Sequence, residues 1–249
     1  MPNDHIFSYS FEIQSHHITE NSEVSLPYLL GCMQHTAEAH VNHLHIGWEE
    51  MHTKGYFWAI YRMGLQIHQI PRKYDHIIIR TWANQPHGLL QDRYFEVVSP
   101  KGAILLQALS VWIILDNISF KPQTITEIVN VPDYYCDLQP IKLNLKVPYF
   151  QINEDFPCIT RDVLYSDLDP NHHVNNTNYV KWVIDSYPGV FLREHQLKEM
   201  YINYTLQARL GDRYRIFKQE IDPYLHRCYI LHGNKKEEFC KFTLRWEKR

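Results

Sequence analysis

The sequence predicts an α+β fold built twice, with each half formed by a long helix lying in a curled antiparallel sheet. Most segments of both halves are rich in β-branched and aromatic residues, which favours strands. Helical spacing of apolar residues is clear in only two segments, and each precedes a block of four predicted strands. The final hairpins of the two halves also superpose without a gap, which indicates an internal duplication.

The strands are predicted from composition and from the turn residues between them, such as SPKG before the last strand of the first half. Because only short turns separate them, each block is expected to form a meander. The predicted strands span residues 57–69, 75–83, 89–99 and 103–116 in the first half, and residues 199–210, 212–222, 224–233 and 237–248 in the second.

The first predicted helix covers SLPYLLGCMQHTAEAHVNHL, with Ser25 as N-cap and Pro27 in its first turn. The second covers VNNTNYVKWVIDSY, where Asn175 or Asn176 can cap. Apolar residues recur near helical spacing in both segments, at Leu29, Met33, Ala37 and Leu44 in the first and at Val180, Val183, Ile184 and Tyr187 in the second.

The two halves end in similar hairpins. DRYFEVVSPKGAILLQALSVW and HRCYILHGNKKEEFCKFTLRW align with Arg93 on Arg227 at a shift of 134 (227 − 93), which 246 − 112 also gives for the two tryptophans. Unrelated hairpins could share this pattern, but duplication explains it better. Between the halves, residues 129–148 hold three prolines and no clean periodicity, as a surface linker would. We therefore expect domains at residues 1–145 and 146–249.

Composition argues against several classes of function. The formal net charge of −3 gives no overall basic field for nucleic acid. No apolar run approaches the roughly 18 residues that a membrane-spanning helix needs, and the start lacks the pattern of a signal peptide. The five cysteines are odd in number and far apart, so a reducing cytoplasm is expected rather than a disulfide framework or a metal knuckle.

Cofactor and metal sites are not predicted. The glycines never cluster, so GxGxxG, GxSxG and phosphate-cradling loops do not occur, and HExxH is also absent from the sequence. Of the histidines along the first helix, only His40 and His43 have same-face spacing, and no well-placed carboxylate completes a ligand set. We expect these histidines to lie on the surface.

The stretch DLDPNHHVNN concentrates hydrogen-bonding and titratable groups at the start of the second helix. In an extended segment Asp169, Asn171 and His173 would face the same way. A neutral histidine can take a proton from water, and the helix N-terminus could stabilise an oxyanion. The alternative is that such residues are simply common in turns and caps.

This stretch, extended to SDLDPNHHVNNTNYVKWVIDS, resembles the signature of acyl-acyl carrier protein (ACP) thioesterases of plant plastids and related bacteria. In that family D-x-N-x-H-V-N-N opens the helix of the second of two hotdog domains. LPYLLGCMQHTAEAH, LHIGWEEM, FWAIYRMGLQI and WIILDNISFKPQTI also occur in the family's order. The resemblance implies two tandem hotdog domains that hydrolyse acyl-ACP and end fatty-acid synthesis.

The resemblance also implies roles for individual residues. Asp169, Asn171 and His173 fall on the family's catalytic aspartate, asparagine and histidine. A further acidic residue of the family aligns with Gln207, and plant members have cysteine where this chain has Ala208. If the register holds, these two departures exclude a cysteine nucleophile and leave the role of the missing carboxylate to Asp169 alone or to the uncharged amide of Gln207, which would position water. Attack by Asp169 to form an anhydride is a covalent variant.

The first domain lacks this motif in ITENSEVSLPYLL, so the resemblance implies that it binds the acyl chain instead. Leu29, Met33, Ala37 and the region of Trp58 would line the tunnel, although these residues are equally typical of a core. The preferred chain length is not readable from the sequence.

Two other classes of function stay open. One is an acyl-CoA thioesterase or hydroxyacyl dehydratase of the hotdog fold, and the other is an inert acyl-binding protein, which the departures at Gln207 and Ala208 allow. The expected partner is an acyl carrier protein in a bacterial cytoplasm, and a homodimer is left open. Because that carrier is acidic, basic residues could contact it, and the candidates are Arg72, Lys73, Lys181 and Arg193.

Overall fold

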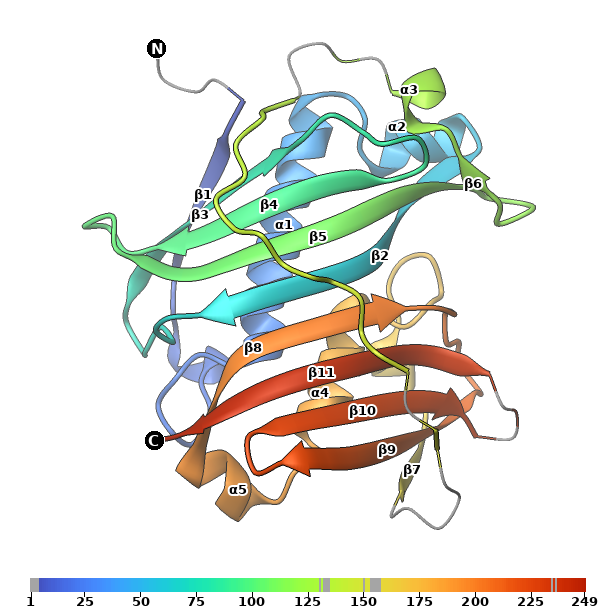
Figure 1. Ribbon diagram of the computed structural model, residues 1–249. Coiled ribbons are helices and arrows are strands. Elements are labelled where there is room, and N and C mark those ends of the chain that lie inside the picture. Colours follow the sequence, from blue (N-terminus) through green and yellow to red (C-terminus); the bar gives the residue numbers. More distant parts are fainter. Residues whose placement is uncertain are drawn as a thin grey trace. The chain divides into compact units, whose positions relative to one another are not determined.

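The computed structural model describes residues 5–129, 131, 135–149, 151–152, 158–233, 235 and 237–249. The chain divides into two compact units, Met1–Leu143 (unit 1) and Asn144–Arg249 (unit 2). Each unit combines an antiparallel sheet with helices (Figure 1), which confirms the predicted α+β class.

Unit 1 contains a sheet with strand order β1-β3-β4-β5-β2, in which β6 pairs with β5. The helix α1 packs against β1 and β3, on one face of this sheet (Figure 1). The strands are β1 (Phe7–Glu12), β2 (Tyr56–Ile67), β3 (His76–Ala83), β4 (Gln91–Val98), β5 (Ile104–Asp116) and β6 (Pro122–Gln123). The helices are the 3-10 helix η1 (Ser15–His17), α1 (Leu26–His43), α2 (Trp48–Thr53) and α3 (Ile125–Ile128).

Unit 2 contains a sheet with strand order β8-β11-β10-β9-β7. The helix α4 packs on it through Trp182, whose ring stacks on Tyr214 with centroids 3.9 Å apart. The strands are β7 (Cys158–Asp162), β8 (His195–Tyr204), β9 (Arg213–Asp222), β10 (Leu225–His232) and β11 (Glu238–Lys248). The helices are the 3-10 helix η3 (Tyr165–Asp167), α4 (Asn176–Ile184) and α5 (Gly189–Glu194).

The predicted strand over residues 199–210 is wrong at both ends. The strand β8 starts at His195 and ends at Tyr204. Beyond it the amides of Thr205 and Leu206 both donate to the carbonyl of Phe239, which breaks the regular ladder. The chain then turns sharply between Arg209 and Asp212 instead of continuing as a strand. The other predicted strands and both long helices are confirmed within a few residues.

The described part of the predicted linker, residues 129, 131 and 135–148, contains no helix or strand, as predicted. However, hydrogen bonds hold this linker to neighbouring segments more firmly than is expected of a surface linker. The Cys136 amide donates to the carbonyl of Ala83 at 2.8 Å, and the indole of Trp82 donates to the carbonyl of Leu138 at 2.9 Å. In unit 2, Asn203 exchanges hydrogen bonds with the linker backbone.

The duplication inferred from the hairpins extends to their structure. Moving β4 by 134 residues places its ends, 91 and 98, at 225 and 232, which are the ends of β10. The same shift carries the start of β5, residue 104, to residue 238, where β11 begins. These strand ends therefore fall where the shift places them, but the pairing register differs by one residue, because Arg93 pairs with Ser110 whereas Arg227 pairs with Thr243 and not with Leu244.

Candidate active site

The segment with the D-x-N-x-H pattern is a tight loop at the start of α4, not an extended strand. Leu168 and Val174 pair across it, and the amide of Asp169 donates to the carbonyl of His173 at 2.7 Å. His172 takes a left-handed conformation with φ of 61° and closes a turn onto Asp169. The expectation that alternate side chains face the same way in an extended segment is therefore wrong in its geometry.

The carboxylate of Asp169 nevertheless forms hydrogen bonds with the backbone of the other two predicted residues in the loop. One of its oxygens, Oδ1, accepts the backbone N–H groups of Asn171 at 2.8 Å and of His173 at 3.2 Å. An aspartate that bonds the backbone of following residues fixes a turn. The loop thus holds Asp169, Asn171 and His173 together, while their catalytic roles stay a prediction.

His173 is the titratable group best suited to accept a proton. It is 8% exposed, and its pKa lies below the ordinary histidine value of 6.5. Burial is the main cause, the positive charge of Arg209 adds to it, and the carboxylate of Asp169 opposes it. The imidazole is therefore neutral at pH 7, which is the form that acts as a general base.

Arg209 is a feature of the site that sequence reasoning missed. It follows Ala208, whose carbonyl accepts the amide of Val174 at 2.9 Å, directly after His173 in the loop. The buried hydroxyl of Tyr179 in α4 accepts the amide of Ala208 at 2.9 Å. Because residues up to 210 are predicted as strand, the predicted turn starts too late to place this arginine beside the loop.

Gln207 directly precedes Ala208, whose backbone bonds both the loop and Tyr179, and the side chain of Gln207 is exposed. The following Ala208 is completely buried. The backbone therefore brings residue 207 close to the loop, and its proposed role in positioning water stays a prediction.

The N-terminus of α4 is already partly occupied. The side chain of Asn175 caps the helix by accepting the amide of Thr177 at 3.0 Å, and its carbonyl accepts the amide of Asn178 at 2.9 Å. This confirms the predicted cap, but these two N–H groups are not available to an oxyanion. An oxyanion site built on these amides is therefore not supported by the structure.

The corresponding loop of unit 1 has the same conformation at a shift of 150 residues (173 − 23). The amide of Thr19 donates to the carbonyl of Glu23 at 2.8 Å, as Asp169 does to His173, and Ser22 has a φ of 59° where His172 has 61°. Thr19, Asn21 and Glu23 thus occupy the positions of Asp169, Asn171 and His173. Unit 1 forms the same loop with threonine and glutamate where unit 2 has Asp169 and His173. The loop conformation alone therefore does not require the aspartate and the histidine.

Two expectations for α1 have different outcomes. Leu29, Met33 and Ala37 are buried in the core, which was the alternative to lining an acyl tunnel. His40 is also buried, contrary to the expected surface location, and its Nδ1 lies 3.2 Å from Nη1 of Arg93. Burial and the arginine lower its pKa to about 3.

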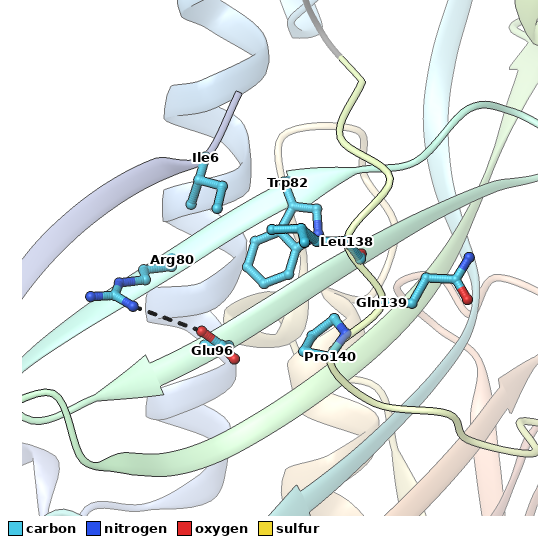
Figure 2. Close-up of a pocket in the computed structure, with 7 residues that line it drawn as sticks. All are labelled: Ile6, Arg80, Trp82, Glu96, Leu138, Gln139 and Pro140. Atoms are coloured by element: carbon cyan, nitrogen blue, oxygen red, sulfur yellow. Dashed lines mark hydrogen bonds and ion pairs between the residues drawn. The ribbon is translucent and has the colours of Figure 1, made fainter. Parts of the chain in front are cut away.

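A cavity of about 300 Å³ lies in unit 1 between the sheet and the linker (Figure 2). An ion pair between Arg80 and Glu96, 3.9 Å apart, borders it. Trp82 faces Leu138 of the linker at its other side (Figure 2). None of the predicted site residues lines this cavity.

Within the residues that the structure covers, no group of three or more His, Cys, Asp or Glu side chains is arranged to hold a metal ion. Among those same residues, no helix has the length and apolar character needed to cross a membrane.

The sequence matches two family models over most of its length. The acyl-ACP thioesterase N-terminal domain matches residues 4–131, and the acyl-ACP thioesterase C-terminal domain matches residues 154–248. The chain belongs to the acyl-ACP thioesterase family. Both family domains are present in the order that the resemblance implied.

Two plant relatives in this family are similar at low identity. A chloroplastic palmitoyl-acyl carrier protein thioesterase of Gossypium hirsutum is 26% identical over 216 residues, covering 82% of this chain and 52% of that protein. A chloroplastic oleoyl-acyl carrier protein thioesterase of Arabidopsis thaliana is 24% identical, covering 83% of this chain and 61% of that protein. The chain therefore spans about half to three fifths of the length of these two relatives.

Solved structures of acyl-ACP thioesterases show the same fold. An acyl-ACP thioesterase from Bacteroides thetaiotaomicron has a TM-score of 0.89 at 23% identity and covers 99% of this chain and 100% of that one. The 12:0-ACP thioesterase from Umbellularia californica has a TM-score of 0.86 at 19% identity and covers 98% of each chain.

Proposed function

We propose that the protein hydrolyses the thioester of fatty acyl-ACP to free fatty acid and carrier thiol, which ends fatty-acid synthesis. The observation that carries this proposal is the loop in which Asp169 holds Asn171 and a buried, neutral His173 beside Arg209. The family supplies the substrate class, because the plant relatives act on acyl carrier protein thioesters by name.

The proposed reaction uses water as nucleophile. His173 takes a proton from water as the oxygen attacks the thioester carbonyl, and the imidazolium then returns a proton to the departing thiolate. Asp169 fixes the loop and favours the imidazolium, while Asn171 and Gln207 position the water. Arg209 offers positive charge to the oxyanion, a role that the occupied amides of α4 leave open.

We further propose that the two units are tandem hotdog domains, with residues 1–145 binding the acyl chain and residues 146–249 carrying out catalysis. The repeated loop, helix and sheet of the two units support this division. The Thr19-Asn21-Glu23 loop of unit 1 lacks a histidine, so we assign the chemistry to unit 2 alone.

We propose a cytoplasmic location together with the carrier. The five cysteines are free thiols, four of them buried, which is typical of a reducing compartment.

The test is an assay of the purified protein on acyl-ACP, acyl-CoA and 3-hydroxyacyl-ACP. Thiol release that is fastest from acyl-ACP is the expected result. Faster release from acyl-CoA would make the protein an acyl-CoA thioesterase, and loss of water from the hydroxyacyl substrate would make it a dehydratase. Tight binding without any release would leave an inert acyl-binding protein.

A further inference from the structure

Two turns of unit 2 flank the loop that carries His173. The first contains η3, and the second connects β8 to β9. The amide of Val163 donates to the carbonyl of Asp212, and the amide of Val174 donates to the carbonyl of Ala208, each at 2.9 Å. The first bond therefore ties the two turns to each other, and the second ties the β8–β9 turn to the end of the loop.

Four large apolar side chains on these turns are exposed. Their exposed fractions are 60% for Leu164, 82% for Tyr165, 44% for Leu206 and 57% for Leu210. Single exposed apolar residues are ordinary, but several on adjoining turns mark an interaction site. We name these four residues the apolar rim.

Unit 1 contains the same two turns, with polar residues at the four positions that match the apolar rim, although Tyr74 in its second turn is also 65% exposed. Its amide of Ile13 donates to the carbonyl of Asp75 at 2.9 Å, as Val163 does to Asp212. The backbone amide of Arg72 donates to the Asp75 carboxylate at 2.7 Å, as Arg209 does to Asp212 at 2.8 Å. At shifts of 150 (164 − 14) and 137 (206 − 69), the residues that match the apolar rim are Gln14, Ser15, Gln69 and Lys73.

Unit 1 forms the same turns with polar side chains at the four matching positions. The backbone conformation of these turns therefore does not require apolar side chains at those positions in unit 2. Leaving such side chains exposed to water gains nothing for the folded state, since burial is what makes them stabilising. The apolar rim therefore indicates contact with a partner.

The charges around the apolar rim indicate the character of this partner. Arg161 and Arg209 are exposed, and the guanidinium of Arg161 donates to a backbone carbonyl, that of Thr160, at 3.2 Å. The carboxylate of Asp162 is engaged by Arg213 at 2.7 Å, and that of Asp212 by the backbone of Arg209. Two arginines beside engaged carboxylates favour an acidic partner.

We propose that the apolar rim together with Arg161 is the docking surface for the acidic acyl carrier protein that presents the thioester. This inference rests on the proposed function. Docking next to the loop makes entry of the tethered thioester effectively intramolecular, so it raises the rate for carrier-bound substrate without taking part in the chemistry.

The experiment compares two substrates that share one thioester, acyl-ACP and acyl-pantetheine. A rim variant carries Leu164→Gln, Tyr165→Ser, Leu206→Gln and Leu210→Lys, which copies the residues of unit 1. We expect kcat/KM for acyl-ACP to fall about tenfold or more, which corresponds to about 1.4 kcal/mol. For acyl-pantetheine we expect a change of less than about twofold. Ile118→Gln, at a side chain 86% exposed in unit 1, is the matched control and should change neither value.

Charge is tested separately with Arg161→Glu, which should lower kcat/KM for acyl-ACP and weaken its dependence on salt. If the full rim variant does not fold, Tyr165→Ser and Leu210→Lys are tested singly. Equal losses on both substrates, or no loss on either, would overturn the proposal. So would loss of binding to anionic lipid vesicles with unchanged acyl-ACP kinetics, since the surface would then face lipid.

Failure of the proposed function is distinguishable from failure of the docking surface. If the unmodified protein hydrolyses neither substrate, the hydrolase assignment fails. The docking surface is then tested by calorimetric binding of acyl-ACP to the unmodified protein and to the rim variant. Equal affinities would overturn it, and about tenfold weaker binding by the variant would support it.

Discussion

Replacing His173 by alanine should abolish most of the hydrolysis while leaving the protein folded. Loss of a general base lowers a rate by about 10²- to 10⁴-fold, which is about 3 to 5 kcal/mol of transition-state stabilisation. The fold should tolerate the change, because the Asp169 carboxylate bonds the backbone amide of residue 173, which alanine keeps. We expect the free energy of unfolding to fall by about 1 to 2 kcal/mol.

The assay follows release of the carrier thiol from acyl-ACP under single-turnover conditions, with urea unfolding measured on the same preparations. Glu23→Ala, at the matching position of unit 1, is the control because it alters an equivalent loop without the proposed chemistry. It should keep turnover within a few-fold of the unmodified protein. A His173→Ala variant that keeps more than a tenth of the activity, or a control that loses as much, would refute the assignment.

Three further predictions follow from the charges and hydrogen bonds around the loop and α1. Because the pKa of His173 is depressed, the acid limb of the pH profile of kcat/KM should lie below pH 6.5. Arg209→Gln should move this limb to higher pH, and Asp169→Asn should move it to lower pH. If neither substitution moves the limb, His173 is not the titrating base. His40 has a pKa of about 3 when folded and 6.5 when unfolded, so the unfolded chain binds the extra proton and stability falls as the pH drops through this window. Urea unfolding should show a loss of about 3 kcal/mol between pH 7 and pH 4, which His40→Gln removes and exposed His43→Gln does not; an equal loss in all three proteins would contradict this. Tyr179→Phe should cost about 1 to 3 kcal/mol in urea unfolding, because it leaves the buried amide of Ala208 without its acceptor, and an unchanged midpoint would argue against that bond.

Local sequence patterns predicted those parts of the fold that depend on neighbouring residues. The two long helices, the strands β2 to β5 and β9 to β11, and the cap at Asn175 follow from side-chain periodicity and from short-range hydrogen bonds, whereas β1, β6 and β7 were not predicted. Both operate over a few residues, so they are readable without the fold. The prediction failed at residues 205–210, where hydrogen bonds to Phe239 on another strand end β8. These contacts span more than thirty residues of sequence, and no local pattern reports them.

The D-x-N-x-H segment, the family and the α+β class could all be identified from residue patterns along the chain. The closed turn of that segment, the place of Arg209 beside His173 and the burial of His40 against Arg93 became apparent in the folded protein. The tertiary structure also matched Thr19, Asn21 and Glu23 to the catalytic candidates, a correspondence hidden by their different chemistry. The physical reason is that residue type fixes what a side chain can do, whereas its charge state and neighbours depend on burial and on contacts made by distant segments.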